Sequence, residues 1–280
     1  MIDLHSHTLH SDGQRSPEEL LAEAAQAGVT VLSLTDHDTI SGVPAATAAA
    51  TQRGIRLVPG IELSCELHGR EVHILGHFLD PACSALLQLA SNMLAERRER
   101  MEKMIARAHA AGFTGVTLER VVAASGGENL GRPHLARALV DCGHATSVKD
   151  AFDRYLHSRG PLWVDRRRLT VAEAVELVRT AGGTSSVAHP GPNGISRQEL
   201  KKCADAGLDA VEALHPDHVP TQSAAYERWA KELRLHVTAG SDYHGPAIQP
   251  GRKLGDRILS VERFAALEEV AKSRRPCATS

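Results

Sequence analysis

The sequence has 280 residues, a formal net charge of −2, 42% hydrophobic residues and 24% charged residues. This length and composition suit a globular chain with a sizeable core, and the near-neutral charge gives no general attraction to nucleic acid or to a membrane surface. Aromatic residues make up only 3%, which argues against an extended platform for stacking bases. No apolar run approaches the roughly 18 residues that a membrane span needs.

The five cysteines are few and far apart: Cys65, Cys83, Cys142, Cys203 and Cys277. Their number is odd and none forms a Cys-x-x-Cys motif, a pattern typical of buried free thiols in a reducing compartment. The sequence opens directly in a strand-like segment, without the basic and apolar regions of a signal peptide. We therefore expect a cytoplasmic protein with no membrane association, and nothing in the pattern indicates a protein partner.

Hydrophobic patterning predicts alternating strands and helices in the first 80 residues. Strands are expected at 2–7, 29–35, 56–59 and 71–78, the third ending at Gly60-Ile61-Glu62, and helices at 16–27 and 39–53. The segment Ser16-Pro17-Glu18-Glu19 is typical of a helix start, because it combines an N-cap, an early proline and an acidic first turn.

The alternation stops after about residue 80. Only helical patterns follow, at 84–111, 117–125, 133–142 and 147–158. Strands then return at 185–188, 210–213 and 236–240, separated by helices near 170–181, 196–206 and 221–233. The pattern predicts an α/β, barrel-like domain made of residues 1–80 and 162–280, interrupted by a helical insertion at 81–161 that we expect to act as a substrate-binding cap.

Histidine is unusually frequent, with 16 residues, and many lie with carboxylates where predicted strands end. These segments are Asp3-Leu4-His5-Ser6-His7, Thr35-Asp36-His37-Asp38, Gly60-Ile61-Glu62, Val187-Ala188-His189 and Ala239-Gly240-Ser241-Asp242-Tyr243-His244, and His73 lies in the fourth predicted strand. An α/β barrel places its chemistry at the strand ends, and residues two apart in a strand, such as His5 and His7, project to the same face. A single histidine is more often an ordinary core residue, but this many polar side chains on one face without partners would cost several kcal/mol. The pattern therefore predicts a metal site.

These motifs resemble the polymerase and histidinol phosphatase (PHP) superfamily over residues 1–80 and about 162–250. Within it, the chain is most similar to bacterial 3',5'-nucleoside bisphosphate phosphatases and 5'-3' exoribonucleases related to ribonuclease AM, which share the helical insertion and its Gly-Arg-Pro-His segment. The resemblance implies a distorted (β/α)7 barrel that holds two or three divalent ions.

The resemblance also implies a ligand set. The first ion would be held by His5, His7, Glu62 and Asp242; the second by Glu62, His73 and His189; and the third by Asp12, His37 and His244. Glu62, Asp242 and His189 would form the catalytic part of this centre. All of these side chains offer nitrogen or oxygen, which suits manganese first, with iron(II) or zinc as alternatives. Divalent ions at these residues would carry more charge than the three carboxylates neutralise, as an anionic phosphate substrate requires.

Asp36 and Asp38 flank one of these ligands, and each has two possible roles. Either carboxylate would orient a ligating histidine or cap the helix that follows.

The insertion carries the residues expected to bind substrate. A helical wheel places Arg97 within the apolar stripe of the helix at 84–111, formed by Leu86, Met93, Met101, Met104 and Ala108, with Arg98 and Arg100 at its edges. Arg97 is therefore expected to point toward an anion, unless its head extends to solvent. Arg132 and His134 come at a predicted helix start, where backbone N–H groups favour a phosphate. Asp12 and His37 would face the same space, whereas Arg166, Arg167 and Arg168 are expected to form a solvated face.

Together these features predict a metal-dependent phosphoesterase. The resemblance implies release of the 3'-phosphate from nucleoside 3',5'-bisphosphates, and trimming of short, 5'-phosphorylated RNA or DNA is consistent with the same pocket. One alternative is a histidinol-phosphate or other small phosphomonoester phosphatase, which needs no second phosphate pocket. Another is a non-catalytic binding module stabilised by metal.

Overall fold

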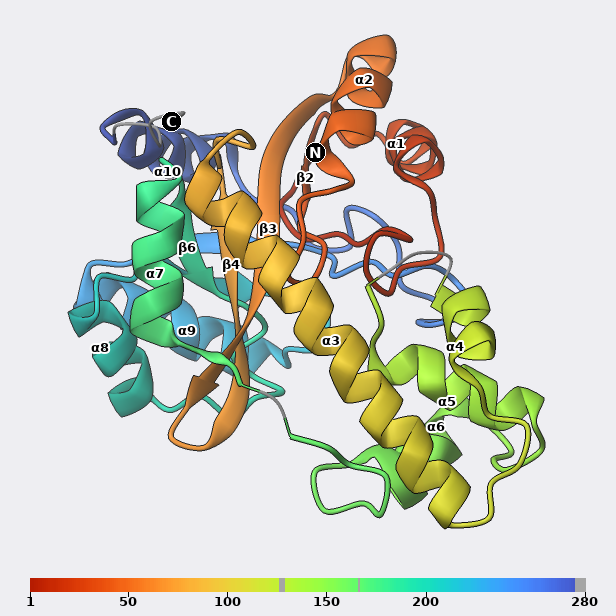
Figure 1. Ribbon diagram of the computed structural model, residues 1–280. Helices are drawn as coiled ribbons and strands as arrows, with labels where there is room; N and C mark the ends of the chain where they lie inside the picture. Colours follow the sequence, from red (N-terminus) through yellow and green to blue (C-terminus); the bar gives the residue numbers. More distant parts are fainter. Residues whose placement is uncertain (126–128, 166, 275–280) are drawn as a thin grey trace.

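The computed structural model describes residues 1–125, 129–165 and 167–274 (Figure 1). It is a mixed α/β chain in which one sheet curls into a nearly closed barrel and a group of helices extends from one side. The strands are β1 (Ile2–Asp3), β2 (Val31–Leu34), β3 (Arg56–Leu67), β4 (Arg70–His77), β5 (Leu169–Thr170), β6 (Thr184–Val187), β7 (Ala210–Leu214) and β8 (His236–Ala239).

The sheet follows the order β1-β2-β3-β4-β6-β7-β8, and β5 pairs with β3 off this path. The two end strands are brought together beyond β1, where the Leu4 amide donates to the Ala239 carbonyl at 3.0 Å and Ser6 bridges Tyr243 in parallel. The seven strands of this path therefore close on themselves, and the expected distorted barrel is confirmed.

The distortion lies at β3 and β4. The third strand was expected to end at Glu62, and this prediction was wrong, because β3 continues to Leu67 and pairs antiparallel with β4. β4 also pairs antiparallel with β6. In this hairpin Glu62 lies opposite Leu75, and His73 lies opposite Ser64. Glu62 and His73 therefore enter the site from the middle of two strands, not from strand ends.

In the described part of the chain, six helices pack around the barrel: α1 (Pro17–Gln26), α2 (Val43–Arg53), α7 (Val171–Thr180), α8 (Arg197–Asp205), α9 (Pro220–Leu233) and α10 (Val261–Lys272). The predicted start of α1 is confirmed. The Ser16 side chain accepts a hydrogen bond from the Glu19 amide, and the Glu19 carboxylate accepts one from the Ser16 amide. α2 begins four residues later than expected, since Ser41 and Gly42 form a turn and Gly42 is the N-cap of the helix. β5 and α10 were not predicted.

The insertion contains α3 (Ser84–Ala110), α4 (Leu118–Ser125), α5 (Arg132–Asp141), α6 (Val148–Ala151) and the short π-helix η1 (Phe152–Leu156). α3 crosses the front of the molecule from the barrel to the other helices of the insertion (Figure 1). Its stripe is buried as predicted: Leu86 belongs to the core of the barrel, and Met101 and Met104 belong to a separate core inside the insertion.

The structure bears on two features of the composition, apolar segments and cysteines. None of the helices in the described ranges is long and apolar enough to cross a membrane. Cys65 and Cys203 are buried free thiols and Cys142 is a half-buried one, but Cys83 is disulfide-bonded. The expectation of free thiols throughout is therefore wrong at Cys83.

Candidate metal centre

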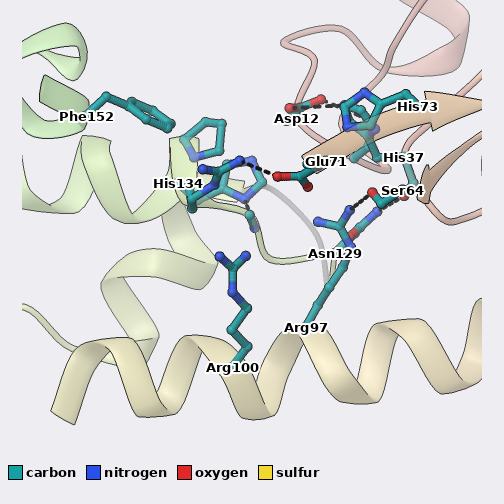
Figure 2. A pocket seen from close by; sticks show the side chains of 14 residues that line it. Asp12, His37, Ser64, Glu71, His73, Arg97, Arg100, Asn129, His134 and Phe152 are labelled. Atoms are coloured by element: carbon teal, nitrogen blue, oxygen red, sulfur yellow. Dashed lines mark hydrogen bonds and ion pairs between the residues drawn. The ribbon is translucent and has the colours of Figure 1, made fainter. Parts of the chain in front are cut away.

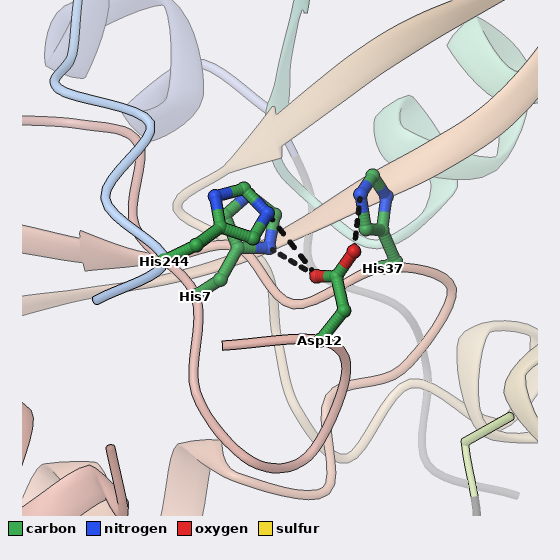
Figure 3. A group of neighbouring side chains, drawn as sticks. All are labelled: His7, Asp12, His37 and His244. Atoms are coloured by element: carbon green, nitrogen blue, oxygen red, sulfur yellow. Dashed lines mark ion pairs between the residues drawn. The ribbon is translucent and has the colours of Figure 1, made fainter. Parts of the chain in front are cut away.

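One end of the barrel gathers the nine predicted ligands. His5 and His7 follow β1, Glu62 and His73 come from the β3–β4 hairpin, and His189, Asp242 and His244 follow β6 and β8. Figure 3 shows Asp12 facing three imidazole rings. Its carboxylate lies 3.1 Å from His244 Nε2, and 3.9 Å from both His7 Nδ1 and His37 Nε2.

Glu62 lies at the centre of the cluster, with its side chain almost fully buried. Its two oxygens face different histidines. Oε1 lies 2.8 Å from His73 Nδ1 and 3.0 Å from His189 Nε2. Oε2 lies 3.2–3.3 Å from ring nitrogens of His5, His7 and His37. A carboxylate with donors grouped around each oxygen has the arrangement of a bridge between two ions.

Within the described residues, three groups of side chains offer ligand atoms that all lie within 4.8 Å of one another. They are His5-His7-Glu62-Asp242, His7-Asp12-His37-His244 and His37-Glu62-His73. The first equals the set inferred for the first ion. The second contains the three residues inferred for the third ion and adds His7. The third differs more, because it contains His37 in place of His189, whose Nε2 lies 3.0 Å from Glu62 Oε1.

Two ligands adopt backbone conformations that non-glycine residues rarely use. His189 has a φ of 28° and Asp242 has a φ of 52°, and such conformations are strained and concentrate at functional sites. Both follow the carboxyl end of a strand. The sharp turn directs each side chain back over the barrel end, toward Glu62 and His5.

The charges in the cluster are strongly coupled. Burial opposes charge on His7, but contacts with Asp242 and Glu62 outweigh it and raise the pKa of His7 to about 10. At His37 burial prevails and lowers the pKa to about 3. Although burial favours the neutral acid, His37 and His73 hold the pKa of Glu62 well below its usual range. Such opposed shifts within one cleft are typical of functional sites.

The centre opens onto a pocket of about 230 Å³ that the barrel and the insertion line together (Figure 2). Asp12, His37 and His73 lie on the barrel side. Seven of the predicted ligand and substrate residues line the pocket, and unpredicted residues line it as well, among them Ser64, Glu71, Asn129 and Phe152. The predicted substrate residues Arg97, Arg100, Arg132 and His134 all line this pocket.

The arginines of the pocket already have partners in the protein. Arg97 Nε donates to Asp38 Oδ2 at 3.0 Å, so the anion it reaches is a buried carboxylate of the barrel. Arg100 Nε donates to the Val164 carbonyl at 2.6 Å. Arg132 lies 3.2 Å from Glu71, and its guanidinium stacks on the Trp163 ring with 4.8 Å to the ring centre.

His134 differs from these arginines. Its side chain is buried, and its Nδ1 accepts from the Gly131 amide at 3.1 Å. Burial lowers the pKa of His134 to about 4, so the ring is neutral at neutral pH and carries its proton on Nε2. Nε2 is buried without a hydrogen-bond partner in the part of the chain that the structure describes. A buried N–H donor without an acceptor lowers the stability of the fold, unless a bound ligand supplies the acceptor.

The predicted solvated face is wrong at Arg168, whose side chain is only 8% exposed and lies 3.6 Å from Glu71. Arg167 is exposed as expected, and Arg166 lies outside the described residues.

Comparisons with known proteins place this site in context. The PHP domain model matches residues 3–115. The 5'-3' exoribonuclease Rnm of Salmonella typhimurium is 34% identical over 91% of this chain and 89% of its own. The 3',5'-nucleoside bisphosphate phosphatase of Chromobacterium violaceum is 33% identical over 91% of this chain and 90% of its own. A Bifidobacterium adolescentis crystal structure, described as a metal-dependent phosphoesterase, superposes with a TM-score of 0.86 at 29% identity, covering 96% and 95% of the two chains.

The chain belongs to the PHP family.

The hydrogen bonds described for Asp36 and Asp38 differ from those expected from the sequence. Asp36 accepts from the Thr8 amide and hydroxyl and from the Ser11 hydroxyl, so it shapes the loop that carries Asp12. Asp38 accepts from the Ser64 amide and hydroxyl and from Arg97. Neither contacts a ligating histidine through a hydrogen bond described in the structure, and neither caps α2, whose N-cap is Gly42.

A carboxylate that contacts two of the predicted ligands in this PHP domain was not predicted. Glu212, in the middle of β7, is completely buried. Its Oε1 lies 2.9 Å from His5 Nδ1 and its Oε2 accepts from the His189 amide at 2.7 Å. A ligating histidine commonly gives its second nitrogen to such a carboxylate, which fixes the ring. The signal in the sequence was one charged residue inside the apolar strand Ala-Val-Glu-Ala-Leu.

Proposed function

We propose that this chain is a metal-dependent phosphoesterase that releases the 3'-phosphate of nucleoside 3',5'-bisphosphates and leaves nucleoside 5'-monophosphates. Short RNA or DNA with a 5'-phosphate would be trimmed from that end in the same pocket. The observation that carries the proposal is the shared pocket, because the predicted metal ligands form one wall and the cationic, hydrogen-bonding face of the insertion forms the other.

The ligand set fits two or three divalent ions, most simply manganese. Its members are imidazoles and carboxylates without a thiolate, and Glu62 has donors around both oxygens. Divalent ions held there would supply Lewis acidity at a phosphate and would lower the pKa of a bound water. The role of Glu62, Asp242 and His189 is to hold those ions at fixed positions beneath the pocket.

The insertion side of the pocket would bind a second phosphate. His134 offers an uncompensated Nε2–H donor, and Arg132 offers a guanidinium at the first residue of α5, where backbone N–H groups add to the attraction for an anion. Arg132 would exchange its contact with Glu71 for the phosphate. Arg97, because it binds Asp38, would shape the wall and not contact substrate directly. Phe152 supplies an apolar part of the lining.

The phosphate pocket separates this proposal from the simpler alternatives. A phosphatase for small monoesters needs only the metal side, and a non-catalytic module needs no reaction at all. We expect phosphate release from nucleoside 3',5'-bisphosphates with added Mn²⁺, and loss of release after treatment with a chelator. The matched comparison is a nucleoside 3'-monophosphate, which presents the same leaving phosphate without the 5' group.

The outcome is read from kcat/KM for the two substrates. A clear preference for the bisphosphate supports the proposal. Equal values for the two would favour a general phosphomonoesterase, and histidinol phosphate should then be tested directly. No release from any phosphomonoester, bisphosphate or 5'-phosphorylated oligonucleotide in the presence of Mn²⁺, Fe²⁺ or Zn²⁺ would leave the binding-module alternative.

A further inference from the structure

The two carboxylate oxygens of Asp242 face different surroundings. Oδ1 lies 3.3 Å from both His5 Nε2 and His7 Nε2, and 3.5 Å from His244 Nδ1. Oδ2 points away from these ligands. It lies 3.3 Å from Arg252 Nη1 and 3.5 Å from His215 Nε2. One oxygen therefore faces the predicted metal ligands, and the other faces two groups that the proposed function leaves unexplained.

His215 follows directly after β7, and its side chain is 1% exposed. Its Nδ1 accepts a hydrogen bond from the Asp217 amide at 3.2 Å. A neutral imidazole that accepts at one nitrogen carries its proton on the other, so Nε2 is the donor. Nε2 has no hydrogen-bond partner of normal geometry among the described residues, and the carboxylate oxygen it approaches is Oδ2 of Asp242.

The nearby His218 makes a useful contrast. Its Nδ1 donates to the Ala213 carbonyl at 3.0 Å, and its Nε2 accepts from the Gly191 amide at 3.0 Å. Both ring nitrogens are therefore hydrogen-bonded to the backbone, as expected of a histidine with a structural role. In His215 only Nδ1 bonds to the backbone, and the buried Nε2–H points toward Asp242, a predicted metal ligand.

Arg252 joins the same group from further along the segment between β8 and α10, which also carries Asp242. Its side chain is only 10% exposed, and it pairs with both Asp217 and Asp242. The loop after β7, which carries His215 and Asp217, and the loop after β8, which carries Asp242, are thereby tied together. Asp242 also has a strained backbone, with a φ of 52°, so its side-chain position depends on contacts that hold it.

We propose that His215 is a positioning residue which, together with Arg252, holds Oδ2 of Asp242 so that only Oδ1 faces the ion bound with His5, His7 and Glu62. Groups that orient a metal ligand fix its geometry and its basicity. A carboxylate held by one oxygen cannot rotate to chelate the ion with both, which leaves a coordination position for substrate. The inference rests on the proposed metal centre, and it does not depend on which phosphoester is hydrolysed.

The test uses two substitutions with the same functional group and different reach. In His215→Gln the side-chain amide nitrogen can occupy roughly the place of Nε2. In His215→Asn the amide is one methylene shorter and cannot approach Oδ2. The measurement is Mn²⁺ affinity, obtained by titrating the metal-free full chain and following free Mn²⁺ by electron paramagnetic resonance. Melting temperatures in chelator show whether each variant is folded.

We expect His215→Asn to weaken Mn²⁺ binding by about 10- to 100-fold, the usual cost of removing a group that orients a ligand. His215→Gln should stay within about threefold of the wild type, since it keeps a charge-neutral donor at the required reach. In the His215→Asn variant Asp242 is free to rotate and bind Mn²⁺ with both oxygens, which should also change the line shape of the Mn²⁺ resonance. The same titration on His215→Leu provides a variant without any donor, expected to resemble His215→Asn.

Two results would overturn the proposal. One is wild-type Mn²⁺ affinity in folded His215→Asn and His215→Leu. The other is an equal loss in the Gln and Asn variants, which would mean that ring shape matters and the donor does not. A wild type that binds Mn²⁺ but releases no phosphate would refute the proposed function and leave this inference testable. A wild type that binds no Mn²⁺, Fe²⁺ or Zn²⁺ would refute both.

Discussion

Arg132→Ala is the most informative single substitution for substrate specificity. A charge-assisted hydrogen bond to a phosphate is worth about 1.5–3 kcal/mol, which corresponds to roughly 10- to 100-fold in kcat/KM. The structure places the expected effect near the lower end of that range. Arg132 already contacts Glu71 at 3.2 Å, with the two side chains 26% and 25% exposed, so binding a phosphate replaces one anionic partner with another.

The same contact provides an opposite perturbation. Glu71→Gln removes the competing charge while it keeps the size of the side chain. A partly exposed ion pair is worth about 0.5–1 kcal/mol, so we expect kcat/KM for a nucleoside 3',5'-bisphosphate to rise about two- to fivefold. Arg132→Ala should lower the same quantity about tenfold. Neither substitution should change kcat/KM for the nucleoside 3'-monophosphate by more than about twofold.

The assay is steady-state phosphate release at saturating Mn²⁺, with both substrates and all three proteins. The decisive quantity is the ratio of kcat/KM for the bisphosphate to that for the monophosphate. If Arg132→Ala lowers both values by the same factor, Arg132 supports the fold or the metal centre and does not read a second phosphate. The nucleotide assignment would then lose the insertion as its support.

Four further predictions concern the metal centre and the insertion. Asp242→Asn should lower turnover at least 10²-fold at saturating Mn²⁺, and near-normal phosphate release would contradict its role as a ligand. Because the pKa of His7 is raised to about 10 in the metal-free chain, Mn²⁺ binding near pH 8 should release protons, and the affinity for Mn²⁺ should increase as pH rises. The measurement is the binding enthalpy by calorimetry in buffers of different ionisation enthalpy. A binding enthalpy that is the same in all buffers would contradict this prediction. The same shift stabilises the metal-free fold below pH about 6.5, and that contribution should be lost as pH rises toward 10. Arg97→Met removes the guanidinium that pairs with the buried Asp38 carboxylate and should lower the free energy of unfolding by about 3–5 kcal/mol. The measurement is denaturant unfolding without metal, and Arg97→Met combined with Asp38→Asn should recover part of the loss.

The metal side of the site followed from the sequence because its signals are local. Residues two apart in extended backbone project to the same side, so the spacing of His5 and His7 brings both rings together even though β1 ends at Asp3. Glu62 was also identified, but for the wrong structural reason. Its strand was expected to end there, and instead it continues into an antiparallel hairpin with β4. Strand length and direction depend on pairing with a distant segment, which periodicity along one strand does not report.

Partners that join distant segments were harder to predict. The pairing of Arg97 with Asp38 joins residues 59 positions apart, and Glu212 reaches His5 over 207 positions. The sequence showed that Arg97 lies in the buried stripe of its helix, and therefore that it needs an anion. It did not show whether that anion is a substrate phosphate or a carboxylate of the protein, because both satisfy a buried guanidinium.

The helix α3 has a consequence for any attempt to divide the protein. It runs without glycine or proline from Ser84 to Ala110, about 40 Å at 1.5 Å per residue, and it contributes Leu86 to one hydrophobic core and Met104 to another. An uninterrupted helix resists bending in its middle, so the insertion cannot swing on a flexible joint at this end, and it moves only if the whole rod tilts. A truncation that removes the insertion would therefore also strip a covering side chain from the barrel. Loss of activity in such a fragment would report destabilisation of the barrel more than loss of substrate recognition. Point substitutions of the residues that line the pocket therefore test substrate recognition more directly.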